Sequence, residues 1–197
     1  GVKKDAPLPF AVNNEHLLGE HNRQDILFAL EAAKHFGVDT AAAERAVEKF
    51  SGIEHRMEKV GTFRGITFYN DCIATIPHAV ECAVEALKNV DTLIFGGMDR
   101  GLDYSEFENY LKKSNIKNLI GTPETGHKIC DKIEGALQKN VYKAANLDEA
   151  VKKAYEVTAK GKICLLSPAA SSYNCYKNFE EKGKHYKKLV REYGKED

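Results

Sequence analysis

Three short polar stretches, each directly after an apolar run, carry residue types that bind nucleotides or small anions. Tyr69-Asn70-Asp71 follows the first run, Gly96-Gly97-Met98-Asp99-Arg100-Gly101 the second, and Ser167-Pro168-Ala169-Ala170-Ser171-Ser172 the third. A carboxylate can accept hydrogen bonds from ribose hydroxyls or help to order a cation, and a guanidinium matches a carboxylate or phosphate. Paired glycines let the backbone approach a ligand, and a helix start after the serines would offer N–H groups to an anion. The sequence therefore predicts a binding site built from these stretches.

Each stretch also has an ordinary structural interpretation. Asp71, with Thr75 and Pro77 after it, can simply cap the next helix, because helix N-termini favour Asp and Thr. The glycine-rich stretch matches neither G-x-G-x-x-G nor G-x-x-x-x-G-K-[ST], so it predicts no dinucleotide site and no P-loop. The serines of 167–172 can form an N-cap, and the serine-hydrolase pattern G-x-S-x-G is absent. The pattern alone leaves both interpretations open.

Weaker candidates lie elsewhere along the chain. His21-Asn22 can present an amide to a base edge or cap a helix, and His55-Arg56 can bring a guanidinium to phosphates or form a surface pair. His78, His127 and His185 lack the spacing of metal ligands, so no zinc site is expected. The lysine-rich final helix is interpreted as a solvated face.

Alternating strands and helices must position these residues. Ile66–Tyr69 alternates β-branched and aromatic residues, Pro77 opens a helix, and the apolar run Asp91–Phe95 suits a buried parallel strand. This alternation predicts an α/β fold with a mostly parallel sheet and helices on both faces, and ligands of such sheets bind at the carboxyl ends of the strands. The further predicted elements are a hairpin of Met57–Val60 and Ile66–Tyr69 around Gly61–Gly65, helices near Tyr104–Lys113, Gly126–Leu137, Leu147–Ala159 and Tyr176–Tyr193, and strands near Lys117–Ile120, Asn140–Ala144 and Lys162–Leu166.

Two helices come before the sheet and have no strands of their own to cover. The first is predicted from about His21 to Gly37, and the second from Thr40 to Ser51-Gly52. They are interpreted as the end of a preceding domain, residues 1–54, with a hinge near Ile53–Arg56 and a second domain over 55–197. Both methionines are internal and residue 1 is glycine, so we expect a fragment of a longer chain.

The composition is that of an ordinary soluble globular protein, with 197 residues, 43% hydrophobic and 29% charged. A formal net charge of +0 does not favour nucleic acid or an anionic membrane as a partner. No apolar run approaches the roughly 20 residues that span a bilayer, and no signal peptide is visible. The five cysteines have no C-x-x-C spacing, and Cys82, Cys130 and Cys164 are expected as buried thiols in a reducing cytoplasm.

A set of stretches in fixed order carries a family resemblance from Leu18 onward. The set resembles the Mur ligases, and within that family the members that add D-glutamate. The stretches are Gly19-x-His21-Asn22, Ser51-Gly52-x-x-His55-Arg56-x-Glu58, Tyr69-Asn70-Asp71-x-x-Ala74-Thr75-x-Pro77, Gly96-Gly97-x-Asp99-Arg100-Gly101-x-Asp103 and Leu165-Leu166-Ser167-Pro168-Ala169-x-x-Ser172…Lys177-Asn178-Phe179-Glu180-x-x-Gly183.

The resemblance implies a cytoplasmic, monomeric, three-domain ligase of peptidoglycan precursor synthesis that depends on ATP and Mg²⁺. Its partners would be UDP-N-acetylmuramoyl-L-alanine, D-glutamate and ATP. The alanyl carboxylate would become an acyl phosphate, which the amine of D-glutamate attacks. Residues 1–54 would be the tail of the central ATP-binding domain and 55–197 the whole C-terminal Rossmann-like domain. The P-loop and most Mg²⁺ ligands would lie outside this sequence, so the fragment alone is expected to be inactive.

The resemblance also implies roles for individual residues. Asn22 and Asp25 would lie at the adenine, Arg56 at the phosphates or ribose, and Asp71 at the ribose hydroxyls. Arg100 and the backbone after Ser172 would bind carboxylates, so these two are expected to lie close together. The residues assigned to D-glutamate are Thr75, Arg100, Ser172, Tyr173 and Phe179.

Some positions depart from the family pattern. Ile73 stands where the D-glutamate-adding members usually have lysine, Asp25 replaces a usual asparagine, and Arg100 replaces lysine. Ile76 and Asn174 also differ. Two alternatives to a D-glutamate ligase therefore stay open. One is a divergent amide ligase with another amino-acid acceptor, and the other is a module that binds a nucleotide or amino acid without catalysis.

Overall fold

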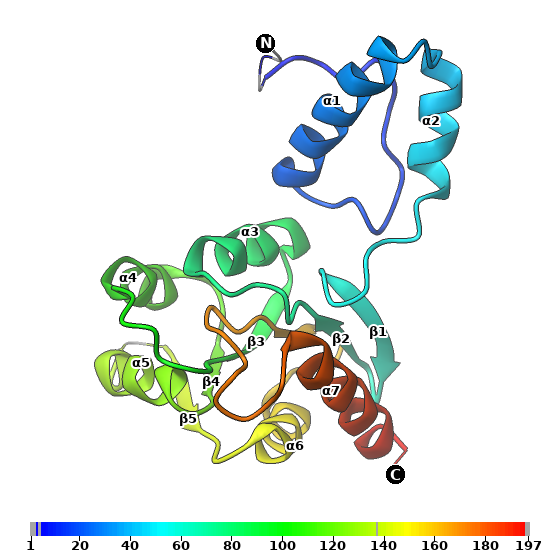
Figure 1. Cartoon of the computed structure of the whole chain (residues 1–197). Coiled ribbons are helices and arrows are strands. Elements are labelled where there is room, and N and C mark those ends of the chain that lie inside the picture. Colours follow the sequence, from blue (N-terminus) through cyan, green and yellow to red (C-terminus); the bar gives the residue numbers. More distant parts are fainter. Residues whose placement is uncertain (1–2, 4, 137, 196–197) are drawn as a thin grey trace.

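Strands and helices alternate after two initial helices in the computed structural model, which describes residues 3, 5–136 and 138–195 (Figure 1). The helices are α1 (Glu20–His35), α2 (Thr40–Lys49), α3 (Pro77–Leu87), α4 (Ser105–Lys113), α5 (Thr125–Ile133), α6 (Leu147–Val157) and α7 (Phe179–Tyr193). The strands are β1 (Glu58–Phe63), β2 (Ile66–Asn70), β3 (Val90–Phe95), β4 (Asn118–Gly121), β5 (Asn140–Lys143) and β6 (Ile163–Leu166).

The sheet has the strand order β1-β2-β6-β3-β4-β5. β1 is antiparallel to β2, and the other neighbouring strands pair in parallel. β3 is buried at every residue, as its continuous apolar run predicts for a strand covered on both faces. The predicted α/β fold with a mostly parallel sheet is therefore confirmed.

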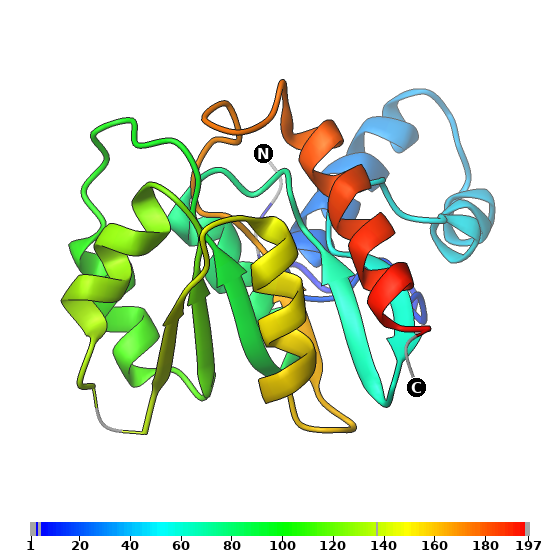
Figure 2. The same ribbon diagram turned by 90° about the horizontal axis from the view of Figure 1, so that it is seen from below.

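Helices cover both faces of the sheet because the path of the chain reverses at β5. From β3 to β5 the chain moves outward, and it then returns to place β6 between β2 and β3. Leu93 and Phe95 pack with α3, α4 and α5, whereas Ile94 packs with α6 and α7. Figure 2 shows α6 and α7 side by side. Each such fully buried side chain contributes roughly 1.5–3 kcal/mol relative to an exposed one.

The hairpin differs from its prediction in the length of the turn. Instead of a loop over Gly61–Gly65, β1 continues to Phe63 and the turn consists of Arg64 and Gly65 alone. Both turn residues have positive φ, 51° and 82°, which matches a tight hairpin to the twist of the two strands. A register shift between Lys59 and Gly61 accommodates the glycine inside the strand.

Two helix ends also differ from prediction. α7 begins at Phe179 rather than Tyr176, because the Asn178 side chain caps it by accepting a hydrogen bond from the Glu181 amide at 2.9 Å. α5 ends at Ile133, and the predicted end at Leu137 lies outside the described residues.

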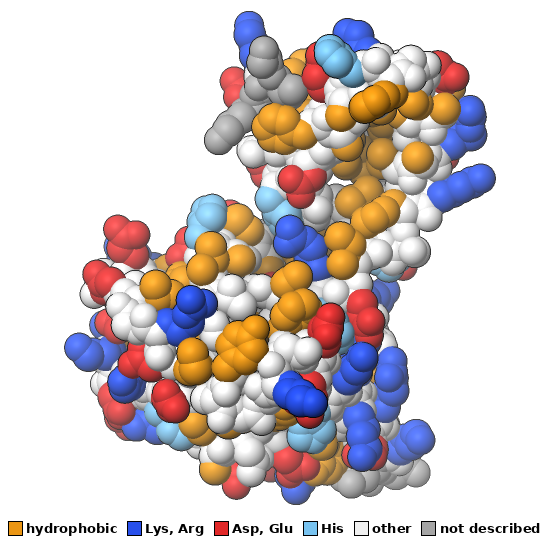
Figure 3. Space-filling model, viewed as in Figure 1, with side chains coloured by type: hydrophobic (Ala, Val, Ile, Leu, Met, Phe, Trp, Pro, Cys, Tyr) orange, Lys and Arg blue, Asp and Glu red, His pale blue; other side chains and the backbone are white. Residues whose placement is uncertain are grey.

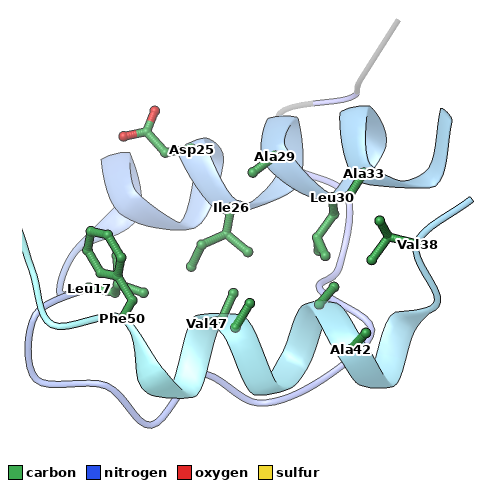
Figure 4. Close-up of a pocket in the computed structure, with 12 residues that line it drawn as sticks. Leu17, Asp25, Ile26, Ala29, Leu30, Ala33, Val38, Ala42, Val47 and Phe50 are labelled. Carbon is green, nitrogen blue, oxygen red and sulfur yellow. The ribbon is translucent and has the colours of Figure 1, made fainter. Parts of the chain in front are cut away.

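α1 and α2 form a pair beside the sheet, with an apolar cavity of about 370 Å³ between them (Figures 1 and 4). Ile26, Leu30, Val47 and Phe50 point into this space, whereas the Asp25 carboxylate points away from it. α1 also approaches α3, since a Cβ at Gly19 would lie 2.7 Å from the Cβ of Ala86.

The environment of the cysteines differs from the prediction at one position. Cys130 and Cys164 are buried as expected. Cys82 is only half-buried, because it faces the side of α3 where His78 Nε2 lies 3.7 Å from its sulfur.

None of the helices in the described part of the chain has the length and apolar character needed to cross a membrane.

Candidate functional site

Three loops meet at the carboxyl edge of the central strands. The β2 loop (71–76), the β6 loop (167–178) and the β3 loop (96–104) follow three adjacent strands. The β3 loop leads to α4 on one face, and the β6 loop leads to α7 on the other. Strands whose connections diverge in this way mark the usual ligand-binding position of an open α/β sheet.

The β3 and β6 loops are joined by direct contacts at what we call the β3–β6 junction, residues 97–100 and 171–172. The Met98 amide donates to the Ser171 carbonyl at 2.7 Å, and Arg100 Nη1 donates to Ser171 Oγ at 3.3 Å. Gly97 permits the approach, because a Cβ there would lie 2.2 Å from the Ser171 carbonyl oxygen. The structure thus places Arg100 beside the residue that precedes Ser172, as the sequence led us to expect.

Ser172 starts a single turn rather than a helix. Its carbonyl accepts from the Cys175 and Tyr176 amides, and α7 begins only at Phe179. The helix predicted from Tyr176 therefore starts three residues later, and the serines lead into this turn first. The turn nevertheless offers donors, since no hydrogen bond of the described residues uses the backbone N–H of Tyr173 or Asn174, although the Asn174 side chain donates to the Pro123 carbonyl at 2.8 Å. Ser172 itself is 3% exposed, and its hydroxyl oxygen has no partner within the described ranges.

The other residues assigned to the amino acid lie farther along these loops. Tyr173 is 65% exposed, and Thr75 is half-buried in the β2 loop. Phe179 packs edge-on against His55, with ring centroids 5.9 Å apart. Among the described residues, no hydrogen bond or ring contact joins Thr75, Tyr173 or Phe179 to Arg100.

Asp71 is a buried acceptor rather than a helix cap. Its Oδ2 accepts from the Ser167 hydroxyl at 2.7 Å, its Oδ1 accepts from the Met57 amide at 3.1 Å, and the N-cap of α3 is Ile76. The capping interpretation is therefore wrong. Burial raises the pKa of Asp71 to about 6, against the opposing effects of these hydrogen bonds and of Arg56.

Replacing Asp71 with asparagine should flatten the pH dependence of stability. The wild-type carboxyl ionises near pH 3.8 when unfolded and near pH 6 when folded, so the native state holds the proton longer. The free energy of unfolding should therefore fall by roughly 2.4 kcal/mol between pH 4 and 7 because of this group. Urea denaturation at both pH values measures the difference between wild type and Asp71→Asn. Identical pH dependence of the two proteins would contradict this account.

The residues assigned to the nucleotide gather around Arg56. Its charge acts on Asp71 and also on His21, whose pKa is lowered mainly by burial and then by Arg56. Asn22 is buried, and its amide nitrogen donates to the Leu18 carbonyl at 2.7 Å, which leaves its carbonyl oxygen to accept from a ligand. Asp25 is exposed on α1. Figure 3 shows basic and histidine side chains at the waist between the helical pair and the sheet.

A polar cluster around the buried His55 and Lys187 at the hinge was missed from the sequence. His55 is 2% exposed, so it does not form a surface pair, and its Nδ1 lies 2.9 Å from Asn70 Nδ2. The Lys187 ammonium donates to Glu54 Oε1 at 2.7 Å and to Glu58 Oε1 at 2.8 Å. This cluster holds the segment before β1 against α7.

The final helix is not simply a solvated face. Lys182 and Lys187 are both buried, and the Lys182 ammonium donates to the Gly96 carbonyl at 2.9 Å. The sequence did carry a signal for this burial. Lys182 lies four residues before the buried Tyr186, and Lys187 lies three residues before the buried Val190, so both lysines fall on the buried side of the helix. The interpretation of this lysine-rich helix as solvated is therefore wrong at these two positions.

Comparison with known families gives a match over the sheet. Residues 55–170 match the family model described as "Mur ligase, glutamate ligase domain".

Curated relatives of the chain share one name. The UDP-N-acetylmuramoylalanine–D-glutamate ligase of Caldanaerobacter subterraneus subsp. tengcongensis is 40% identical over 184 residues, which is 91% of this chain and 40% of the relative. The ligase of that name from Oenococcus oeni is 40% identical over 175 residues, or 89% of this chain and 40% of the relative. The chain thus spans about 40% of the length of these relatives.

Solved structures share the fold at low sequence identity. UDP-N-acetylmuramate–alanine ligase from Thermotoga maritima matches with a TM-score of 0.63 and 19% identity, covering 89% of this chain and 39% of that one. Folylpolyglutamate synthase from Mycobacterium tuberculosis, solved with ADP, matches with a TM-score of 0.61 and 15% identity, covering 92% and 41%. These likenesses establish the architecture alone.

Proposed function

The chain belongs to the Mur ligase family, and from this membership we propose that it is the C-terminal part of a UDP-N-acetylmuramoylalanine–D-glutamate ligase. Supporting this are relatives of that name at 40% identity over about nine-tenths of the chain. We propose that residues 1–54 are the tail of a central ATP-binding domain and that 55–197 form the C-terminal domain. The complete enzyme would act in the cytoplasm as a monomer.

The β3–β6 junction is the observation that carries this proposal. D-glutamate has two carboxylates and one amine. Arg100 supplies a planar cationic donor, and the Ser172 turn supplies two backbone amides and a buried hydroxyl without a partner in the described structure. Charge-assisted hydrogen bonds from such donors are about twice as strong as neutral ones. We propose that they hold and orient the dianionic amino acid, with Thr75, Tyr173 and Phe179 completing the subsite.

The residues around Arg56 fit a nucleotide. The Asn22 carbonyl oxygen can accept from an adenine amino group, the exposed Arg56 can bind phosphate, and Asp71 has a second lone pair on each oxygen for ribose hydroxyls. Bound ATP would supply the phosphoryl group that makes a carboxylate oxygen a good leaving group. The carboxylates of Glu54 and Glu58 already face Lys187, so we expect Mg²⁺ to be held mainly by residues outside this sequence.

Amino-acid-dependent phosphate release from the full-length protein tests the proposal. With ATP, Mg²⁺ and UDP-N-acetylmuramoyl-L-alanine, D-glutamate should support phosphate release, and the chain 1–197 alone should release none. Release with a different amino acid would instead indicate a divergent amide ligase. Failure of all amino acids, with nucleotide still bound, would favour a non-catalytic module.

A further inference from the structure

Lys182 is a lysine buried inside the protein. Its side chain lies on the inner face of α7 and is 4% exposed. Its ammonium donates to the Gly96 carbonyl at 2.9 Å, and no carboxylate of the described residues lies within ion-pair distance of it. Burying an ammonium without a counter-ion is costly, so a lysine at this position calls for an explanation beyond packing.

The neighbouring thiols do not neutralise this charge. Cys72 lies close enough to interact electrostatically with Lys182, and burial raises the pKa of Cys72 to about 12. Cys72 is therefore an uncharged thiol at neutral pH. Burial lowers the pKa of Lys182 itself, and its electrostatic interactions with Cys72 and Cys175 oppose that shift.

The ammonium lies at the base of both loops of the β3–β6 junction. Gly96 begins the β3 loop that carries Arg100, and the Gly96 amide donates to Pro168 of the β6 loop at 2.8 Å. On its other side Lys182 lines a cavity of about 50 Å³ together with Asn174, Cys175 and Tyr176. These three residues belong to the turn that starts at Ser172, so Lys182 also borders that turn.

We propose that Lys182 is a positioning residue for the amino-acid subsite. It holds the Gly96 carbonyl at the start of the Arg100 loop and places a positive charge behind the Ser172 turn, so that the junction favours a dianionic amino acid. This inference rests on the proposed function. The charge acts without touching the ligand, and interior screening is weak enough for it to do so.

Three substitutions in the full-length protein separate the charge from the hydrogen bond. Lys182→Arg keeps the charge and the donor, and the adjoining cavity gives it room. Lys182→Gln keeps a donor without charge, and Lys182→Met removes both. The KM for D-glutamate should rise about tenfold in Lys182→Gln and Lys182→Met, which corresponds to about 1.4 kcal/mol, and should stay near wild type in Lys182→Arg. The KM for ATP should change less than about twofold, which corresponds to well under 1 kcal/mol.

Several outcomes would overturn the inference. If Lys182→Gln behaves as wild type and Lys182→Met does not, the hydrogen bond alone matters. Equal loss of kcat in all three variants, with unchanged KM for D-glutamate, would indicate a structural role. Urea midpoints of the same variants show whether each is folded. Wild-type turnover of D-glutamate tests the proposed function independently, so the two failures are distinguishable.

Discussion

Replacing Arg100 with methionine in the full-length protein should lower kcat/KM for D-glutamate by about 100- to 1,000-fold. The guanidinium lies beside Ser171 at the β3–β6 junction, where we propose that it binds a carboxylate of the amino acid. Losing a bidentate, charge-assisted hydrogen bond removes about 3–4 kcal/mol of binding free energy for an anion. Initial rates at varied D-glutamate concentration, with ATP and the nucleotide substrate saturating, measure the effect.

Arg100→Lys is the matched control for this experiment. It keeps the positive charge but not the planar fork, so we expect it to recover most of the loss, to within about tenfold of wild type. The KM for ATP should not change in either variant, because Asp71 follows β2 and Arg100 follows β3, and β6 lies between these two strands. A normal rate with Arg100→Met would show that the Arg100 guanidinium does not bind the amino acid.

Replacing Gly97 with alanine should destabilise the chain by about 2–4 kcal/mol. The new Cβ would lie 2.2 Å from the Ser171 carbonyl oxygen. This neighbour is backbone, and it also accepts the Met98 hydrogen bond, so it cannot rotate away as a side chain would. Urea denaturation of the chain 1–197 gives the change in the free energy of unfolding.

Gly101→Ala controls for glycine loss in the same loop. A Cβ there would meet nothing within 4 Å, but Gly101 has φ of 70°, so the variant bears only the cost of the left-handed conformation. We expect that cost to be about 1 kcal/mol. Equal urea midpoints for Gly97→Ala and Gly101→Ala would show that the two loops can separate at little cost.

The elements that the sequence predicts well are those whose side chains alternate or form a continuous apolar run. β2 and β3 lie where Ile66–Tyr69 and Asp91–Phe95 indicate, and α3 begins at Pro77 as predicted. The start of α7 was also present in the sequence, because Asn178 and Glu181 have the spacing of a capping pair. The predicted start at Tyr176 overlooks this pair.

The rule that loops after parallel strands meet at one edge of the sheet predicts which site residues lie close together. It does not predict how deeply their side chains are buried. Arg100 and Ser172 were expected together because both follow parallel strands, and the contact of Arg100 with Ser171 agrees. The burial of Asp71 and His55 depends on which loop covers them in space. No pattern of neighbouring residues along the chain carries that information.

The position of β6 has a consequence for how the protein is made. β6 is the last described strand along the chain, yet it pairs with both β2 and β3 in the middle of the sheet. A nascent chain that ends before Ile163 would leave β2 and β3 without the neighbour that joins them. We therefore expect this sheet to close only after the ribosome has released Ile163–Leu166, and pairings of such long range form slowly. Until then, unpaired strand edges are the surfaces that chaperones would have to shield.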